Sequence, residues 1–384
     1  MAGSGERGIP MPETEKQLKN VVEPLVIWFS RVKRRLPWRD EPFPYHVWLS
    51  EIMLQQTRIE AVIPYYIRFL GLYPTVFDLA AADDDRLMKA WEGLGYYSRA
   101  RNLKKTAVLI AADGGEFPRD KASLMRLPGI GEYTAGAIAS ICFGRAEPAV
   151  DGNVLRVLAR YTDDARDVML PAVKKEMTAA LRAIYPAGND AGLLTQALME
   201  LGETVCLPNT VPLCDRCPIA DTCMGKKSGR APSLPVRGKK KERRTETMTV
   251  FVLYDPAGQR YAIRKRPDTG LLASLYEFPH VSGFLDDAAA EEYLRREGLL
   301  PSDVRLFGEG HHLFTHIEWK MRGIYATVGA PSDAFLWATS AQLAHEYAVA
   351  SAFRMCLRET EKRSRVTSDF AGEIPGPKRF DNNS

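Results

Sequence analysis

The pattern of hydrophobic positions divides the chain into two parts. From Gln17 to about Gly225, apolar residues recur at a spacing near 3.6, which predicts about ten helices and no strand. After about residue 245 the runs become β-rich: TMTVFVLYD and QRYAIRKRP around a turn, then two more strands in HHLFTHIEWKMRGIYATV. Helical runs follow at 288–299 and 340–359. The second part is therefore expected to be a separate α+β domain.

Composition marks where these parts begin and end. We expect a mobile N-terminus over 1–14, a helical region over 15–227 and an α+β domain over 246–362. Between the last two, residues 228–245 combine Pro, Gly and charge and are expected to form an exposed linker. The polar tail over 363–384 is expected to be disordered.

The composition is that of a soluble globular protein. Of the 384 residues, 45% are hydrophobic and 26% charged, which excludes a disordered chain. We find no apolar window of about 18 residues and no secretory signal, so we expect no membrane and a cytoplasmic location, at the nucleoid if the source is bacterial. The net charge of +4 hides a basic run from Lys226 to Arg244. A nucleic acid would therefore have to be held by local patches and backbone amides.

Four of the six cysteines lie close together in the sequence, with the spacing C-x7-C-x2-C-x5-C: Cys206, Cys214, Cys217 and Cys223. Four thiolates at this density can hold a zinc ion or a four-iron cluster. Zinc sites usually contain two close pairs, and only Cys214 and Cys217 form one here, which favours iron and sulfur. Cys142 and Cys356 are expected to be ordinary core residues.

A glycine-rich turn precedes a helix in LPGIGEYTAGAIA, residues 127–139. Gly129 and Gly131 let the backbone approach an anion, and the N-terminal amides of the helix from about Glu132 to Phe143 point towards it. A DNA phosphate would fit, although an ordinary helix–turn–helix would give the same pattern. Basic residues that could face DNA, or simply solvent, are Arg34, Arg35, Arg39, Arg99, Arg101, Lys104 and Lys105.

Together these motifs resemble a known family. LPGIGEYTAGAIA, PAVDGNVLRVLAR and the four-cysteine loop resemble the helix-hairpin-helix DNA glycosylases of the endonuclease III superfamily. LPWRD, YHVWLSEIMLQQT and WEGLGYYSRARNL are closer to its adenine DNA glycosylases of the MutY type. The resemblance covers about residues 15–360. It implies a mainly α region with a six-helix barrel module at about 36–145, a cluster module from 15–35 and 146–227, and a Nudix-like C-terminal domain.

The resemblance also implies one 4Fe-4S cluster on the four cysteines. This chain departs from the family in the first gap of the cysteine pattern, where seven residues, LPNTVPL, replace the usual six. A single loop residue can bulge out, so we keep the cluster as the expectation. The C-terminal domain lacks the glutamate-rich pattern that binds magnesium in active Nudix hydrolases, so we expect it to recognise DNA without hydrolysing phosphates.

Two carboxylates are candidates for N-glycosidic bond cleavage. Glu51 has apolar neighbours in a predicted helix, which should desolvate it and raise its pKa, unless its carboxyl reaches water at the helix edge. Asp151 precedes a helix as an N-cap and should stay ionised. By resemblance Glu51 is the general acid, and later the base for water, while Asp151 stabilises the oxocarbenium ion or acts as a transient nucleophile.

Two further residues refine the chemistry by resemblance. Strand-nicking relatives carry a lysine where this chain has Tyr133, which cannot form an imine. Tyr133 is therefore expected beside the carboxylates, in an enzyme that leaves an abasic site, although a packing aromatic would fit the pattern too. Asn153 is expected to orient water or the sugar.

Base flipping requires residues that fill the stack and hold the base. By resemblance Gln56 and Tyr96 are the wedge, and Thr57 and Leu94 contact the opposite base. The purine pocket is expected to contain Leu36, Trp38, Arg39, Gln196 and Met199. The loop that senses the oxidised base is expected at Phe314, Thr315 and His316, where the family usually has a serine in the middle; a strand with a polar edge is the alternative.

These observations predict a monofunctional adenine DNA glycosylase. Its expected partner is duplex DNA with adenine opposite 8-oxoguanine or guanine, and it is expected to act as a monomer. An endonuclease III-like glycosylase/lyase and a DNA-binding relative without catalysis remain the alternatives. Tyr133 and the extra domain argue against the first, and the presence of both Glu51 and Asp151 argues against the second.

Overall fold

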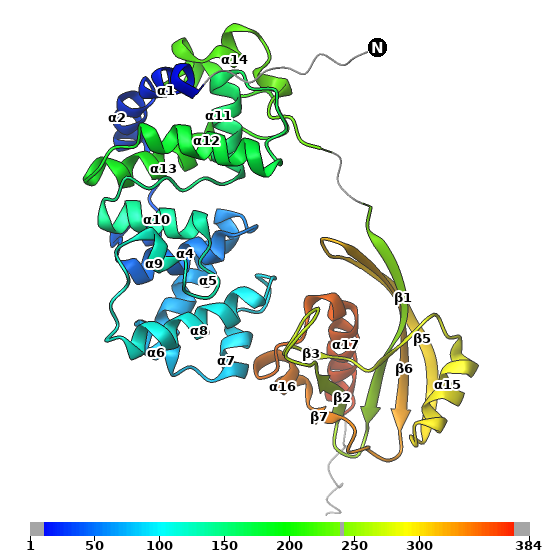
Figure 1. Ribbon diagram of the computed structural model, residues 1–384. Helices are drawn as coiled ribbons and strands as arrows, with labels where there is room; N and C mark the ends of the chain where they lie inside the picture. Colours follow the sequence, from blue (N-terminus) through cyan, green and yellow to red (C-terminus); the bar gives the residue numbers. More distant parts are fainter. Residues whose placement is uncertain (1–10, 239–241, 372–384) are drawn as a thin grey trace, which may run out of the picture. The chain divides into compact units, whose positions relative to one another are not determined.

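The computed structural model describes residues 11–238 and 242–371 (Figure 1). The chain divides into two compact units. The first comprises Met1–Ala82 and Arg99–Lys240, and the second comprises Asp83–Ser98 and Lys241–Ser384. The expected boundary near residue 245 is therefore close to the observed one, but a short segment, 83–98, joins the C-terminal unit instead of the helical one.

Within its described residues the first unit contains helices and no strand, as the hydrophobic spacing predicts. The α-helices are shorter and more numerous than expected: α1 (Met11–Lys19), α2 (Val22–Val32), α3 (Pro37–Asp40), α4 (Pro44–Leu54), α5 (Ile59–Leu72), α6 (Val76–Ala80), α8 (Ser98–Ala112), α9 (Lys121–Leu124), α10 (Glu132–Phe143), α11 (Gly152–Thr162), α12 (Pro171–Ala183), α13 (Asn189–Thr204) and α14 (Met224–Lys227). Short 3-10 turns lie at Cys214–Arg216, Ala220–Thr222 and Ala231–Ser233.

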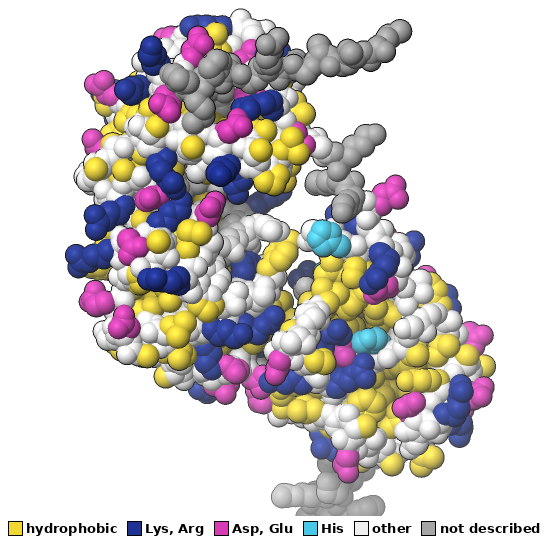
Figure 2. Space-filling view, viewed as in Figure 1, with side chains coloured by type: hydrophobic (Ala, Val, Ile, Leu, Met, Phe, Trp, Pro, Cys, Tyr) yellow, Lys and Arg dark blue, Asp and Glu magenta, His cyan; other side chains and the backbone are white. Residues whose placement is uncertain are grey.

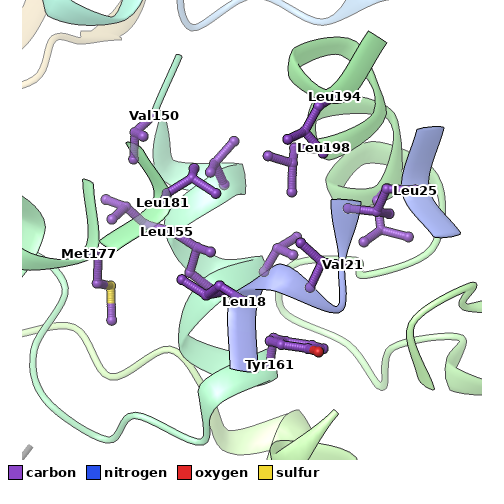
Figure 3. Packing of buried hydrophobic residues seen from close by; sticks show 14 of the residues in the cluster. Leu18, Val21, Leu25, Val150, Leu155, Tyr161, Met177, Leu181, Leu194 and Leu198 are labelled. Atoms are coloured by element: carbon purple, nitrogen blue, oxygen red, sulfur yellow. The ribbon is translucent and has the colours of Figure 1, made fainter. Parts of the chain in front are cut away.

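One core of the first unit joins helices from both ends of its sequence (Figure 3). Leu18 and Leu25, from α1 and α2, pack with Leu155 of α11, Leu181 of α12 and Leu198 of α13. Three of the four clustered cysteines pack against this core, half-buried. Its apolar contacts therefore fix the cysteine loop next to the helix that begins at Asp151.

The second unit is built on a twisted sheet. Its strands are β1 (Arg244–Asp255), β2 (Arg260–Lys265), β3 (Tyr276–Glu277), β4 (His280–Ser282), β5 (Pro301–Leu313), β6 (Ile317–Val328) and β7 (Leu336–Ala338). The main path runs β3-β2-β1-β6-β5, with β1 and β6 parallel and the other pairs antiparallel. Its helices are α7 (Asp84–Ala90), α15 (Asp287–Arg296), α16 (Ser340–His345) and α17 (Arg354–Ala371), with a 3-10 turn at Ser351–Phe353.

A second apolar core lies between this sheet and α15. Ala290 and Leu294 of α15 are buried with Phe251 of β1 and Ile324 of β6. The predicted strands over 311–328 and the predicted helix after 288 are present. The single helix predicted over 340–359 is instead interrupted, because residues 346–350 leave the helix and Val349 bridges to Tyr276 of β3. The α+β assignment of the C-terminal part is therefore confirmed.

Three expected boundaries need correction. Helix α1 begins at Met11, inside the N-terminus that we expected to be mobile, and α17 continues to Ala371, inside the expected tail. The expected linker is not exposed throughout, because Leu234 is buried and its carbonyl accepts a hydrogen bond from Arg160 Nε at 2.8 Å. Residues 1–10, 239–241 and 372–384 lie outside the described residues.

Among the described helices, none has the length and apolar content that a membrane span requires.

Candidate active site

Glu51 is buried on a helix that packs apolar residues on every side. Pro44 starts α4 at its first turn, where a missing N–H costs nothing. Most of α4 is buried, and Glu51 itself is 5% exposed. Burial raises its pKa to about 7, although the hydroxyl of Tyr133 and the charge of Arg39 act in the opposite direction. Its Oε2 has no hydrogen-bond partner among the described residues, so the carboxyl has an oxygen ready for a ligand.

Asp151 is held quite differently. It caps α11, and its Oδ1 accepts hydrogen bonds from the backbone amides of Asn153 at 2.9 Å and Val154 at 2.8 Å. Its Oδ2 accepts a third bond from Asn153 Nδ2 at 3.0 Å. Burial raises the pKa of Asp151, whereas these hydrogen bonds and the charge of Arg156 lower it. The predicted N-cap is present, and donors that favour the charged form surround Asp151 but are absent at Oε2 of Glu51.

The two carboxylates line one cavity of about 120 Å³ in the first unit. All five residues of the expected purine pocket, together with Thr57, Tyr133 and Asn153, belong to the same lining. The Tyr133 hydroxyl lies 3.8 Å from Met199 Sδ, and burial and the nearby Glu51 raise its pKa, so it remains a neutral donor. The structure therefore brings together most of the residues that the sequence predicts for catalysis and base binding. Their individual roles stay predictions.

The sequence analysis missed an acidic residue of this cavity, Glu200. It is buried on α13, and its carboxylate accepts from Arg34 Nε at 2.5 Å and from Arg39 Nη2 at 2.8 Å. Arg39 also lies over the Phe29 ring. Arg34 and Arg39 are therefore paired inside the site and do not simply face DNA. The sequence did contain a signal for this residue: Glu200 lies on the same helix as Gln196, one turn after it, and directly follows Met199.

A path of hydrogen bonds connects Asp151 with the cysteine loop. Arg156 is buried on α11, and its Nη2 donates to Asn153 Oδ1 at 3.0 Å while Asn153 Nδ2 donates to Asp151. The Nε of Arg156 donates to the Cys206 carbonyl at 2.8 Å. The guanidinium of Arg156, which has a fixed shape, thus connects the backbone of the first cysteine with the residue that holds Asp151.

The glycine turn requires one of its two glycines. Gly129 has φ +76°, and a Cβ there would lie 2.7 Å from the Cβ of Asn102. The hydroxyl of Thr106 donates to the Pro128 carbonyl at 2.8 Å and fixes the turn against α8. Gly131 caps α10 with φ −89° and has open space where its Cβ would be. A side chain at position 131 would therefore meet no neighbour, in contrast to one at position 129.

Both expected wedge residues have a left-handed backbone. Gln56 has φ +58° and Tyr96 has φ +47°, which is unusual for residues with a side chain, and both side chains are exposed. Gln56 and Thr57 belong to the first unit, whereas Tyr96 and the buried Leu94 belong to the second. The joint action of these four residues in base flipping stays a prediction.

Arg99, which we considered for contact with DNA, has a structural role. It is 7% exposed, and its Nη1 donates to the carbonyls of Ile52 and Met53 at 2.8 and 2.9 Å. It also donates to the carbonyl of Gln55 at 2.8 Å. Because the last carbonyls of a helix have no partner within the helix, Arg99 completes the C-terminal end of α4.

On the face drawn in Figure 2, Lys and Arg side chains are interspersed with Asp and Glu over both units.

The expected lesion-sensing loop connects β5 to β6. Thr315 and His316 are exposed, whereas the Phe314 ring packs against His312 at 4.6 Å and Trp319 at 4.9 Å, measured between ring centroids. Arg243 Nε donates to the Phe314 carbonyl at 2.9 Å. The loop is therefore anchored through Phe314, with its two polar residues presented to solvent.

The four clustered cysteines line a second, mainly apolar cavity. They form no disulfide, and burial raises the pKa of the Cys217 thiol to about 12, so a metal would have to drive its deprotonation. Asn209, which lies in the first gap between the cysteines, has a left-handed backbone with φ +55°. Among the described residues, however, no three Cys, His, Asp or Glu side chains are close enough to hold one metal ion.

Comparisons with known proteins agree with this geometry. Residues 49–184 match the HhH-GPD superfamily of base excision DNA repair proteins, and residues 249–359 match the NUDIX domain. The chain is 34% identical to an adenine DNA glycosylase of Homo sapiens, over 91% of this chain and 78% of that protein. It is 30% identical to an adenine DNA glycosylase of Buchnera aphidicola, over 78% of this chain and 84% of that protein. A thermostable thymine-DNA glycosylase shares the fold over 56% of this chain and 99% of its own, at 27% identity and a TM-score of 0.50. The chain therefore belongs to the adenine DNA glycosylases, DNA N-glycosylases of base excision repair.

Proposed function

We propose that this enzyme removes adenine from duplex DNA in which it is mispaired with 8-oxoguanine or guanine, and that it leaves an abasic site. The supporting observation is the contrast between the two carboxylates of one cavity. Glu51 has a pKa of about 7 and an unpartnered oxygen, and Asp151 accepts three hydrogen bonds. One environment favours a protonated acid at neutral pH, and the other provides donors to a carboxylate, as glycosidic cleavage requires.

The roles follow from this contrast. Adenine leaves poorly as an anion, so the protonated Glu51 donates its proton to the base, at N7, as the glycosidic bond breaks. The bonding electrons stay with the adenine, and the sugar becomes an oxocarbenium ion that the carboxylate of Asp151 stabilises. Water then adds to the anomeric carbon and gives its proton to Glu51, which restores the acid. Asn153, bonded to Asp151, is placed to orient that water or the sugar.

Tyr133 supports hydrolysis without strand nicking. A phenol cannot form the imine that a lysine forms with the sugar, and the Tyr133 hydroxyl lies next to Glu51. A single-turnover assay with adenine opposite 8-oxoguanine, guanine, cytosine and thymine tests the function directly. We expect fastest release opposite 8-oxoguanine and no covalent adduct after borohydride treatment. A trapped adduct, or release of pyrimidine lesions in preference to adenine, would support the endonuclease III-like alternative.

For the cysteine loop we propose one 4Fe-4S cluster. Each thiolate of such a cluster binds a different iron, so the sulfur atoms lie farther apart than around a single tetrahedral zinc. The four cysteines share one cavity, and their spacing, C-x7-C-x2-C-x5-C with a single close pair, favours the cluster. Its function here is structural, because it would fix the loop that Arg156 connects to Asp151. Purified protein should be brown and contain iron; a colourless protein with stoichiometric zinc would refute the proposal.

We further propose that Phe314, Thr315 and His316 sense the base opposite adenine. Phe314 is anchored, while the polar groups of Thr315 and His316 are exposed and available to an oxidised purine. A threonine in the middle keeps a hydroxyl donor and adds one methyl group to the family's usual serine. We propose that the enzyme acts as a monomer.

A further inference from the structure

The segment 83–98 carries charged side chains that the catalytic site does not use. Asp85 of α7 accepts from Lys265 Nζ at 2.6 Å through one oxygen and from the Tyr276 hydroxyl at 3.2 Å through the other. Lys265 ends β2, and Tyr276 begins β3. A carboxylate of α7 thus meets two donors on neighbouring strands of the C-terminal sheet.

Lys89, one turn further along α7, binds one carbonyl group in the last turn of α16 and another just after that helix. Its Nζ donates to the carbonyl of Leu343 at 3.1 Å and to that of Tyr347 at 3.0 Å. The last carbonyls of a helix have no donor within the helix, and the lysine supplies one together with a favourable charge. The side chain of Lys89 is only 16% exposed and also pairs with Glu92 at 2.7 Å.

Glu92 satisfies an amide that the sheet leaves unpaired. Tyr276 forms a parallel bridge with Val349, in which it bonds to the carbonyl of Ala348 and the amide of Ala350. The amide of Val349 itself therefore points away from β3, and Val349 is 1% exposed. Glu92 Oε1 accepts from this amide at 3.0 Å. A buried N–H group without a hydrogen bond lowers stability, so the amide of Val349 requires an acceptor, which Glu92 provides.

We propose that Asp85, Lys89 and Glu92 form a docking clasp for the C-terminal domain, and that this clasp sets the preference for the base opposite adenine. The expected wedge residue Tyr96 follows the clasp directly, and its hydroxyl lies 3.5 Å from Thr315 Oγ1. The clasp therefore fixes the wedge and the sensing loop in the same unit. Its residues act through position, without contact to the base. The inference rests on the proposed sensing role of residues 314–316.

The design of the test follows from the exposure of the partners. The Asp85 and Lys265 side chains are 39% and 41% exposed, so deleting this ion pair would have little effect. Reversing one charge places two like charges at the same contact, and reversing both restores attraction. We therefore choose the full-length variants Asp85→Lys, Lys265→Asp and the double reversal, with Glu292→Lys as the matched control. Glu292 undergoes the same charge change, but its ion-pair partner is Arg296 of its own helix.

Two readouts are needed. The first is the ratio of single-turnover rates for adenine opposite 8-oxoguanine and opposite guanine; the second is hydrogen exchange of residues 343–349. Each single reversal should reduce the rate ratio about fivefold and increase hydrogen exchange, because the loss of one contact typically shifts a conformational equilibrium by such a factor. The double reversal should restore both the ratio and the exchange, since it restores the attraction. The control should retain the wild-type values.

The possible results separate this inference from the proposal beneath it. The clasp does not form if hydrogen exchange is unchanged in the single variants. The same follows if the double reversal exchanges as fast as the single variants. Increased exchange with an unchanged ratio would show that the clasp forms but does not set the preference. If wild type lacks a preference, or Phe314→Ala with His316→Ala leaves it intact, the sensing loop was misassigned. The exchange data then still decide whether the clasp exists.

Discussion

At the scale of single residues, the two carboxylates of the candidate active site differ in the hydrogen-bond donors around them. Glu51 lies in an apolar environment with one oxygen unpartnered, whereas Asp151 caps a helix and accepts three bonds. A buried carboxyl lowers the stability of the fold when it ionises, unless hydrogen-bond donors compensate fully for the lost hydration. The group that donates the proton should therefore also leave a signature in the pH dependence of stability.

The replacement Glu51→Gln should stabilise the protein more at pH 8 than at pH 5. The unfolded carboxyl ionises above its ordinary value of 4.5, whereas the folded one keeps its proton to about pH 7. Wild-type stability therefore falls as pH rises between these values, by up to about 3 kcal/mol, and the amide escapes this loss. Melting temperatures of both proteins at the two pH values measure it, with the exposed Glu60→Gln as control. A gain that is equal at both pH values would contradict the raised pKa.

Sequence could predict Glu51 and Asp151 because their surroundings are local. The apolar neighbours of Glu51 lie within one turn of its own helix, and Asp151 precedes the helix that it caps. Glu200 could not be found in this way, because its partners Arg34 and Arg39 are more than 160 residues away in the chain. Likewise the burial of Arg99 depends on carbonyls of α4, which no pattern around residue 99 reveals.

At the scale of elements, the glycine turn shows how one position can differ from its neighbour. Both Gly129 and Gly131 fit the expected anion-binding turn, but only Gly129 has a positive φ and a crowded Cβ position. The sequence predicts the turn and the following helix, and the structure tells which glycine the fold requires.

The pair Gly129→Ala and Gly131→Ala tests this difference. The first change should reduce the free energy of unfolding by about 1–3 kcal/mol, because alanine is strained at φ +76° and its Cβ would clash with Asn102. The second should change it by no more than about 0.5 kcal/mol. Urea unfolding of both variants provides the comparison. Equal losses would mean that the turn is not built as described.

Boundaries of elements and domains were less predictable than their types. The Pro-rich stretch after residue 228 resembles a solvated linker, yet Leu234 is buried against the first unit, because Arg160 of α11 supplies a donor that local composition cannot show. Segment 83–98 lies within the helical run of the sequence, yet it belongs to the C-terminal unit. Side-chain contacts such as that of Asp85 with Lys265 connect it to the sheet, and a local sequence pattern does not reveal them.

At the scale of the whole molecule, the residues proposed for catalysis and those proposed for sensing belong to separate parts of the chain. The carboxylates and the purine pocket line one cavity of the first unit, and the sensing loop belongs to the second. Truncation after Gly238 keeps Leu234 in place and should leave an enzyme that still removes adenine. The shortened enzyme should lose its preference for 8-oxoguanine, because the hydrogen bonds that read a base contribute about 1–3 kcal/mol each.

The double variant Phe314→Ala, His316→Ala should reproduce that loss in the full chain. Single-turnover rates opposite 8-oxoguanine and guanine give the comparison, and a mainly helical circular dichroism spectrum would establish that the shortened protein is folded. A truncated enzyme with full preference would move the sensing role to residues around Gln56, Thr57 and Leu94.

Adenine release is expected to depend on a proton that Glu51 donates. The most direct measurement is the single-turnover rate of adenine release from a duplex with adenine opposite 8-oxoguanine, for wild type and Glu51→Gln, between pH 5 and 9, together with duplex affinity. The wild-type rate should decline as pH rises through about 7, the pKa of Glu51. The variant should bind DNA normally and be slower by about 10²–10⁴-fold. Near-normal release by Glu51→Gln would contradict the account.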